Sequence, residues 1–404
     1  MQRISMFEQY PRIQRDQTKR ILRIMLKHAR VTRARIAHIT RLSNSSIVAY
    51  TKALIDMGVI RLCPPSSLHS GRRVEYLEFN PSLGVNIVVV LTMRRIHVSL
   101  VNPAGGIVES QERQIYKGIP KSELLTQLQE AIQWAKDLAE LKLKVMVFGI
   151  GISLGGYIDP LRGISHEYLF SSDWNEVPLT DIMKDRFNLP CLILNDANAA
   201  ALGELHYNAA EGVSNFICIW IGEGIGMGIV VRGELYEGQT SYAGEIGHTK
   251  VRGNDQLCYC GRQGCLETIA SEEYIVATCR EGCRMGVHTE LLQLCDGKVE
   301  QIAIEHVKMA AAHGDRFTQN ILDQVADTLA IKISDAANIL DPEMIVLRGP
   351  VIDGNPYLFE SLRRVALNNT LRPIAQQLTI SYAEGSDDNQ AKGVSSYILW
   401  HYFS

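Results

Sequence analysis

One imidazole and three thiols lie within a single stretch of the chain, between His248 and Cys265. The thiols of Cys258, Cys260 and Cys265 are spaced C-x-C-x4-C, and the neighbouring glycines allow them to turn inward. One histidine and three cysteines match tetrahedral zinc and leave no open position on the metal. The spacing differs from the paired C-x2-C knuckles of a zinc finger, and a redox-active thiol pair is the main alternative. The residues alone therefore favour a closed zinc site and leave the redox pair open.

The elements that must position this stretch belong to a long segment, from Gly84 onward, in which apolar runs alternate with helical patterns. Runs such as LKVMVFGIGISL and PCLILN predict strands, and the second breaks at Asn195-Asp196 into a helix. Further helices are predicted at 121–140 and 316–340. Repeated units of strand, glycine and helix indicate an α/β fold whose site lies at the strand ends. The segment GEGIGMG at 222–228 is either a phosphate loop or a tight hairpin turn.

The first part of the chain has a different pattern, that of short helices followed by a hairpin. A helix is predicted from Gln17 to Lys27, and Thr32 is the expected N-cap of a second helix. The segment RLS turns the chain into a third helix, which Gly58 closes. Two strands around a Pro/Ser/Gly loop then predict a wing with Arg72 and Arg73 at its tip. This is the outline of a winged helix-turn-helix.

Charge separates this head from the rest of the chain. Residues 1–73 contain 15 Lys and Arg against 3 Asp and Glu, whereas the remainder contains 26 against 41. A basic head on an acidic body indicates a polyanionic partner for the head, and we expect DNA. The expected DNA contacts are polar and basic residues of the third helix and the wing: Ser43, Asn44, Ser45, Ser46, Tyr50, Lys52, Arg72 and Arg73. The alternative is that the small polar residues only cap the helix.

A chain of 404 residues, 46% hydrophobic and 21% charged, is too long for one ordinary core. We expect a winged helix-turn-helix domain at 1–80, one α/β lobe at 81–200 plus 390–404, and a second lobe with the zinc site at 201–389. No run of about 18 apolar residues occurs, and the first residues lack a signal-peptide core. Nine cysteines, an odd number, indicate reduced thiols and metal ligation. The expected location is therefore cytoplasmic.

Four motifs occur in order along the body: GISLGGYID at 151–159, NDANAAALGE at 195–204, GEIGH at 244–248 and CYCGRQGCLE at 258–267. With them, roughly residues 17–393 resemble the ROK family of repressors, open reading frames and sugar kinases. The winged head makes the chain more similar to the family's glucose- and N-acetylglucosamine-responsive repressors. The resemblance implies a two-lobed body of the actin and hexokinase type, with one structural zinc ion per chain on His248, Cys258, Cys260 and Cys265. It also implies a sugar site made of Gly155, Gly156, Asn195, Asp196, Glu245, His248 and Glu267.

The nucleotide side of the family pattern is altered, although Asp196 matches the catalytic base of the ROK kinases. The segment VVLTMRRIHV at 89–98 lacks the Asp and Gly of the family's first phosphate turn. Gly222-Glu223-Gly224 stands in place of Gly-Thr-Gly, and a carboxylate there repels phosphate. Arg348-Gly349 stands in place of Gly-Gly. We therefore expect sugar binding without turnover, with Asp196 as a vestigial base position; an ATP-dependent sugar kinase is the alternative.

The resulting hypothesis is a sugar-responsive DNA-binding repressor of genes for carbohydrate uptake or metabolism. Its expected partners are operator DNA, a sugar or sugar phosphate effector, and further copies of the chain in a homodimer or homotetramer. A protein partner such as a sugar transporter component also fits the family. Insertion into a membrane is not expected.

Overall fold

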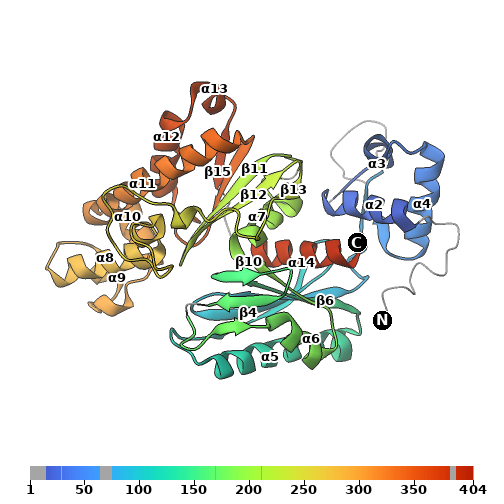
Figure 1. Cartoon of the computed structure of the whole chain (residues 1–404), viewed down its shortest axis with the longest axis horizontal. Helices are drawn as coiled ribbons and strands as arrows, with labels where there is room; N and C mark the ends of the chain where they lie inside the picture. Colours follow the sequence, from blue (N-terminus) through green and yellow to red (C-terminus); the bar gives the residue numbers. More distant parts are fainter. Residues whose placement is uncertain are drawn as a thin grey trace. The chain divides into compact units, whose positions relative to one another are not determined.

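The computed structural model describes residues 15–28, 30–63, 75–168, 170–210, 212–382 and 388–403. The chain divides into two compact units, Met1–Gly212 with Asp387–Ser404, and Val213–Ser386. Figure 1 shows the helices and strands of both units, which are mixed α/β in the body as predicted. The first unit extends beyond the lobe boundary expected after residue 200, because one helix, α7 (Asp196–Tyr207), belongs to it as a whole.

The winged helix-turn-helix predicted at the start of the chain is present in the first unit. Its elements are α2 (Arg15–Leu26), α3 (Arg33–Thr40), α4 (Asn44–Asp56), β1 (Ile60–Leu62) and β2 (Leu77–Phe79). The Thr32 hydroxyl accepts a hydrogen bond from Arg35 N at 3.1 Å, which confirms the predicted N-cap of α3. Gly58 follows α4 with φ 71° and closes it, also as predicted. The two strands pair antiparallel and form the base of the wing.

A five-stranded sheet forms the centre of the α/β part of the first unit, in the order β10-β6-β3-β4-β5. Its strands are β3 (Val85–Leu91), β4 (Arg95–Val101), β5 (Ile107–Gln114), β6 (Val147–Leu154) and β10 (Cys191–Asn195). A small sheet of β7 (Tyr157–Asp159), β8 (Ile164–Glu167) and β9 (Asn175–Val177) follows β6 in sequence. Because β3, β6 and β10 run parallel, their carboxyl ends meet at one edge, where Leu154 pairs with Asn195.

Helices cover both faces of the five-stranded sheet (Figure 1). They are α5 (Lys121–Asp137), which continues as a π-helix over Leu138–Leu143, α6 (Leu179–Phe187), α7 and α14 (Asp388–Tyr402). One face is apolar, and Ile87, Val89 and Ile150 form a core there with α5 and α6. Side chains alternate between the faces of a strand, so the neighbouring residue Gly151 points to the other face. A Cβ on Gly151 would collide with side chains of α14, which therefore lies directly on β6.

Glycines also bring α14 unusually close to α7. A Cβ on Gly393 would meet the carbonyl oxygen of Ala199, and a Cβ on Gly203 would meet Asn389. Main-chain atoms cannot yield as flexible side chains do, so any larger residue at Gly393 would force the helices apart. The pair α7 and α14 therefore packs as one rigid layer on the sheet.

The core of the head is completed by residues from the rest of the first unit. Apolar residues of α2 to β2 form its centre, among them Ile21, Ile36, Ile47, Leu54 and Leu77. Phe148 of β6 and two residues at the end of the chain, Leu399 and Phe403, belong to the same buried cluster. The head and the end of α14 therefore share one hydrophobic core.

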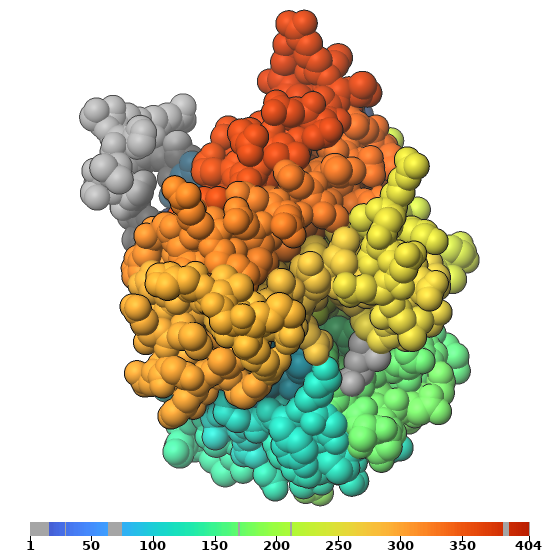
Figure 2. All heavy atoms as spheres, turned by 90° about the vertical axis from the view of Figure 1, so that its left-hand side faces the viewer, coloured from blue at the N-terminus to red at the C-terminus, as the bar shows by residue number. Residues whose placement is uncertain are grey.

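The second unit is built on another five-stranded sheet, in the order β13-β12-β11-β14-β15. Its strands are β11 (Phe216–Ile221), β12 (Ile225–Val231), β13 (Glu234–Leu235), β14 (Met344–Arg348) and β15 (Thr379–Tyr382). Its helices are α8 (Glu272–Arg284), α9 (Leu291–Leu294), α10 (Ile304–Ala312), α11 (Arg316–Leu340), α12 (Pro356–Asn369) and α13 (Arg372–Ala375). Short 3-10 helices cover Ile246–His248, Leu266–Ile269 and Val299–Gln301. Residues 270–340, yellow-orange to orange in Figure 2, form much of the surface of this unit in that view.

All nine cysteines are free thiols in the structure. Cys279 and Cys283, one helical turn apart on α8, are buried in the apolar core of the second unit. Among the described residues, no helix combines the length and the apolar character that crossing a bilayer requires.

Candidate functional site

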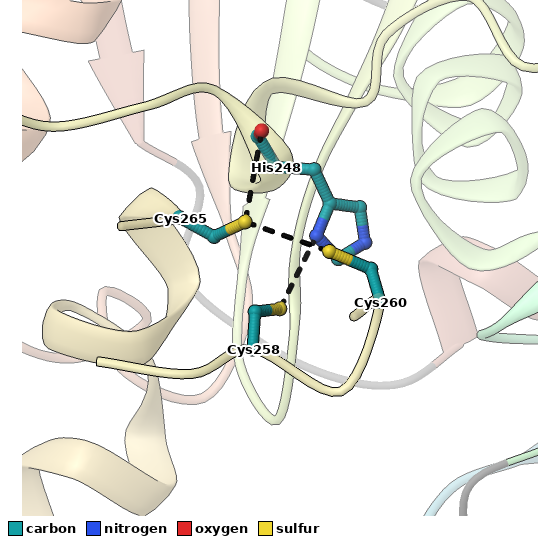
Figure 3. Close-up of side chains that lie close together, drawn as sticks. All are labelled: His248, Cys258, Cys260 and Cys265. Atoms are coloured by element: carbon teal, nitrogen blue, oxygen red, sulfur yellow. Dashed lines mark hydrogen bonds between the residues drawn. The ribbon is translucent and has the colours of Figure 1, made fainter. Parts of the chain in front are cut away.

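The four predicted metal ligands converge on one point of the second unit (Figure 3). One ligand atom from each of His248, Cys258, Cys260 and Cys265 lies within 4.8 Å of all the others. The Sγ of Cys258 is 3.6 Å from His248 Nδ1, and the Sγ atoms of Cys260 and Cys265 are 3.6 Å apart. Zn–S bonds of about 2.3 Å and a Zn–N bond of about 2.0 Å give tetrahedral edges of about 3.5–3.8 Å. The two separations of 3.6 Å match these edges, so the donor set fits a tetrahedral cation.

The local backbone explains why these side chains meet. His248 ends a 3-10 helix, and Cys265 starts another. The loop between them folds back on itself, with Cys258 N donating to Arg262 O at 2.8 Å. Gly261 and Gly264 have φ of 79° and 84°, which residues with a Cβ rarely adopt. The glycines of the motif are thus needed to turn the thiols inward.

The electrostatics of the cluster suit a bound cation. Burial lowers the pKa of His248, and the nearby charge of Arg262 lowers it further, so the imidazole is neutral and able to ligate. Burial acts to raise the pKa of the Cys260 thiol, but hydrogen bonds from Arg262 and the neighbouring thiols lower it to about 7. Burial raises the pKa of Cys258 to about 12, so this thiol needs a cation to ionise.

Three predicted sugar ligands, Glu245, His248 and Glu267, lie in the second unit around this cluster. Glu245 Oε2 is 3.8 Å from His248 Nε2, on the ring edge opposite the thiols. The Glu267 carboxylate is 7% exposed and accepts a hydrogen bond from Ile225 N at 3.1 Å. A Cβ on Gly224 would lie 2.9 Å from Glu267 Oε2, so the glycine makes room for the carboxylate.

Tyr259 is a neighbour of the cluster that sequence reasoning missed. Its hydroxyl lies 3.1 Å from His248 Nε2, and its ring stands at 81° to the imidazole, with the centroids 5.1 Å apart. The available signal was an aromatic residue between two metal ligands, Cys258 and Cys260. That position alone fixes its backbone beside the cluster.

The other four predicted sugar ligands lie together in the first unit, at the carboxyl ends of β6 and β10. Asn195 caps α7, its Oδ1 accepting from the N–H groups of Ala197 and Asn198 at 3.0 and 3.4 Å. A Cβ on Gly155 would be 3.3 Å from Asp196 Oδ2, and Gly156 has φ 87°. Burial raises the pKa of Asp196. The predicted sugar residues therefore form one group in each unit, and their role stays a prediction.

The predicted DNA contacts lie mostly on α4. Ser43 is the N-cap of this helix, and its Oγ accepts from Ser46 N at 3.1 Å, so capping is one of its roles. Ser43, Asn44, Ser45 and Lys52 are exposed, and Ser46 and Tyr50 are partly exposed. Arg72 and Arg73 fall outside the described residues.

Two segments that depart from the kinase pattern form tight turns in the second unit. Gly222 N donates to Gly224 O at 3.0 Å between β11 and β12, so the segment is a hairpin turn. Gly349 has φ 109° and packs against the main chain of Ile221, while Arg348 beside it is 3% exposed.

Comparisons with known proteins agree with both parts of this arrangement. The ROK family model matches residues 91–401, and a winged helix-turn-helix DNA-binding model matches residues 14–61. A putative xylose repressor of Caldicellulosiruptor sp. (strain Rt8B.4) is 31% identical over 347 residues, which cover 85% of this chain and 86% of that protein. The glucokinase of Thermotoga maritima is 33% identical over 266 residues, 66% of this chain and 82% of that enzyme.

A solved structure shares the fold of the whole chain. It is a ROK family transcriptional regulator described as a homologue of the E. coli MLC protein, with a TM-score of 0.78 and 23% identity. The match covers 96% of this chain and 98% of that one, head and body together. The chain therefore belongs to the ROK family and carries a winged helix-turn-helix DNA-binding segment ahead of its ROK body.

Proposed function

We propose that the chain is a sugar-responsive transcriptional repressor. The observation that carries this proposal is the exposed polar N-terminus of α4, on a basic winged head joined to a ROK body. The name of the relative from Caldicellulosiruptor, a putative xylose repressor, supports a pentose as the effector, and the similarity to a glucokinase supports a hexose. Operator DNA and such a sugar, or its phosphate, are then the two partners of the chain.

The head would read DNA with α4. Small polar side chains at the start of a recognition helix can contact phosphates and base edges and allow close approach to the major groove. Ser45 and Asn44 are exposed there, and Lys52 extends the same helix toward phosphates. A homodimer or homotetramer would present two heads to a near-palindrome with half-sites separated by whole helical turns.

The candidate effector contacts are the predicted sugar residues described above for each unit. In the second unit, Glu245 and Glu267 can each accept hydrogen bonds from two vicinal hydroxyls. In the first unit, Asn195 and Asp196 offer further polar atoms. Gly155 leaves space beside Asp196 that a side chain would fill. This assignment rests on the family motif and on the local geometry within each unit.

We propose that the metal is one structural zinc ion per chain, on His248, Cys258, Cys260 and Cys265. Three thiolates and one imidazole suit zinc better than hard cations, and four protein ligands close its coordination shell. A closed site supplies no reactive water, so the ion would tie His248 to the loop that ends at Cys265. The ring orientation of His248, and hence its other nitrogen, would be fixed by this bond.

A ROK sugar kinase is the second candidate function. Asp196, with its raised pKa, and the relationship to glucokinases favour it. Against it stands Glu223 in the hairpin turn where the kinases place a hydroxyl, since a carboxylate repels the phosphates of ATP. We propose that the chain binds sugar without phosphorylating it.

A route from the sugar residues to the head runs along α14. Near its start, Gln390 Nε2 donates a hydrogen bond to Asp196 O at 3.2 Å. Near its end, the Trp400 ring lies 4.9 Å from Cζ of Arg23 on α2 and 5.5 Å from Nζ of Lys27, the residue that follows α2. Such cation–π contacts contribute about 0.5–2 kcal/mol each, depending on how dry they are.

Aromatic packing adds to this contact. Phe403 stacks on Phe79 of β2, with centroids 5.8 Å apart and planes at 14°. Burial, together with the charges of Lys27 and His28, lowers the pKa of His206 on α7 to about 3, so α7 also lies near the residues that follow α2. We propose that effector binding at Asp196 moves α7 and α14 together. Because the head packs on the end of α14, this movement would change the position of the head.

Other partners and the location of the chain stay as proposed from the sequence. A sugar transporter component could compete with DNA for the chain, and a cytoplasmic location fits a DNA-binding protein with free thiols.

The first prediction concerns DNA. In a retardation assay on the DNA upstream of its own gene, wild type should bind specifically, and Asn44→Ala should weaken that binding by about 1–3 kcal/mol. Lys52→Ala should weaken binding to all DNA sequences. It should also reduce the slope of the logarithm of the binding constant against the logarithm of the salt concentration by about 1. Lys142→Ala, an exposed lysine outside the head, is the control. Equal affinity of wild type for this DNA and for random duplexes would contradict the proposal.

The second prediction concerns turnover. Incubated with ATP, Mg²⁺ and either xylose or glucose, the chain should form no more sugar phosphate than Asp196→Asn does, because the Glu223 carboxylate stands where the kinases place a hydroxyl and repels the phosphates of ATP. Robust sugar phosphorylation that disappears in Asp196→Asn would establish the kinase function instead. Coupled detection of ADP and chromatography of the sugar product measure it.

The third prediction concerns the metal. Elemental analysis of the purified chain should find about one zinc ion per chain, since one closed four-ligand site is present. Cys260→Ser should lose the ion and melt at a lower temperature, because a cation bound to the folded state stabilises it by mass action. Cys63→Ser, which removes a thiol of the head, should keep both the zinc content and the melting temperature of wild type. Zinc retained at full content in Cys260→Ser would exclude the proposed ligand set.

A further inference from the structure

The two nitrogens of His248 face different surroundings. Nδ1 is directed to the thiols, 3.6 Å from Cys258 Sγ, whereas Nε2 is 3.1 Å from the Tyr259 hydroxyl and 3.8 Å from Glu245 Oε2. A cation on Nδ1 takes the lone pair of that nitrogen, so the proton of the neutral imidazole is on Nε2. The Nε2–H then donates to the phenol oxygen of Tyr259.

Tyr259 carries this hydrogen bond toward the surface. His248 is 8% exposed, whereas Tyr259 is 45% exposed. The phenol oxygen that accepts from His248 also bears an O–H, which can donate to a further oxygen. A polar ligand that approaches this edge of the imidazole therefore meets the hydroxyl of Tyr259.

The loop from Cys258 to Cys265, which carries the three cysteine ligands, sets the position of Tyr259. Its two chain neighbours, Cys258 and Cys260, are both in the ligand set. The turn that contains it is closed by Cys258 N donating to Arg262 O at 2.8 Å and by Gly261 N donating to Cys258 O at 3.0 Å. Its backbone therefore has little freedom, and its hydroxyl and the Glu245 carboxylate both lie within 3.8 Å of His248 Nε2.

We propose that Tyr259 contacts the sugar effector and helps to determine which sugar is accepted; this rests on the proposed function above. Tyr259 would donate its O–H to one sugar oxygen while it accepts from His248, and the Glu245 carboxylate would accept from neighbouring hydroxyls. A phenol and a carboxylate that both lie at the Nε2 edge of His248 select for the arrangement of hydroxyls on the sugar ring. A site built to bind a hydroxyl discriminates strongly against the analogue that lacks it, because its own polar groups then lose their partner.

Calorimetric titration of the zinc-loaded full chain with xylose, glucose and their single-deoxy analogues tests this role. Tyr259→Phe removes the hydroxyl and keeps the ring. We expect it to weaken binding of the better sugar by about five- to tenfold, the loss of one hydrogen bond. One deoxy analogue, which binds wild type more weakly than the parent sugar, should bind Tyr259→Phe as well as it binds wild type.

Tyr116→Phe is the matched control, since its hydroxyl also contacts a carboxylate, that of Glu123 at 2.9 Å, but in the other unit. Zinc content and melting temperature are measured for both variants and should equal those of wild type.

The outcomes separate the possibilities. Equal sugar affinities of wild type and Tyr259→Phe overturn the role of Tyr259 and leave the proposed function standing. A uniform loss for every analogue, or loss of zinc from Tyr259→Phe, assigns Tyr259 a purely structural role and also overturns it. Wild type that binds no pentose or hexose overturns the proposed function and this role together.

Discussion

α14 packs against α7 and β6 so closely that no Cβ fits at the points of contact, and its far end lies in the core of the head. Gly393 and Gly203 allow the contact between the helices, and Gly151 allows the contact with β6. Phe403 and Leu399 belong to the same buried cluster as α2, α3 and α4. Because packed interiors transmit displacement rather than absorb it, a shift at one end of α14 has to appear at the other. Gly155 directly follows β6 and Asp196 starts α7, the two elements on which α14 rests.

The cluster of His248 and three cysteines imposes a second, local constraint in the other unit. The loop from Cys258 to Cys265 has short hydrogen bonds of its own but little apolar surface, so a bound cation would be its main source of order. The same cation would order Tyr259, which lies between Cys258 and Cys260, and Glu267, two residues after Cys265. The sugar contacts proposed for this unit thus depend on four metal-ligand atoms. The proposed coupling between sugar and DNA depends on α14 in the first unit.

Much of the fold could be predicted from the sequence because its signals are local. The period of the apolar residues gave the limits of α11 to the residue, and the polar pair Asn195-Asp196 marked the change from β10 to α7. The Cys/Gly motif predicted the metal cluster because ligands close in sequence need only a turn to meet. The role of α14 could not be predicted, since it depends on contacts between Trp400 and α2, almost the whole chain apart. Tyr259 was missed because nothing in its spacing says which nitrogen of His248 it would face.

The central claim is that α14 couples the effector to the head, and Trp400→Leu tests it most directly because leucine keeps apolar bulk and loses the aromatic face under Arg23 and Lys27. The measurement is the ratio of operator dissociation constants with and without saturating sugar, by fluorescence anisotropy, for wild type, Trp400→Leu and the control Trp134→Leu on α5. Coupling between two sites is typically about 1–3 kcal/mol, a ratio of about 5 to 150. The account predicts such a ratio in wild type and Trp134→Leu and a ratio near one in Trp400→Leu, whose sugar affinity is unchanged. An undiminished ratio in Trp400→Leu would contradict it.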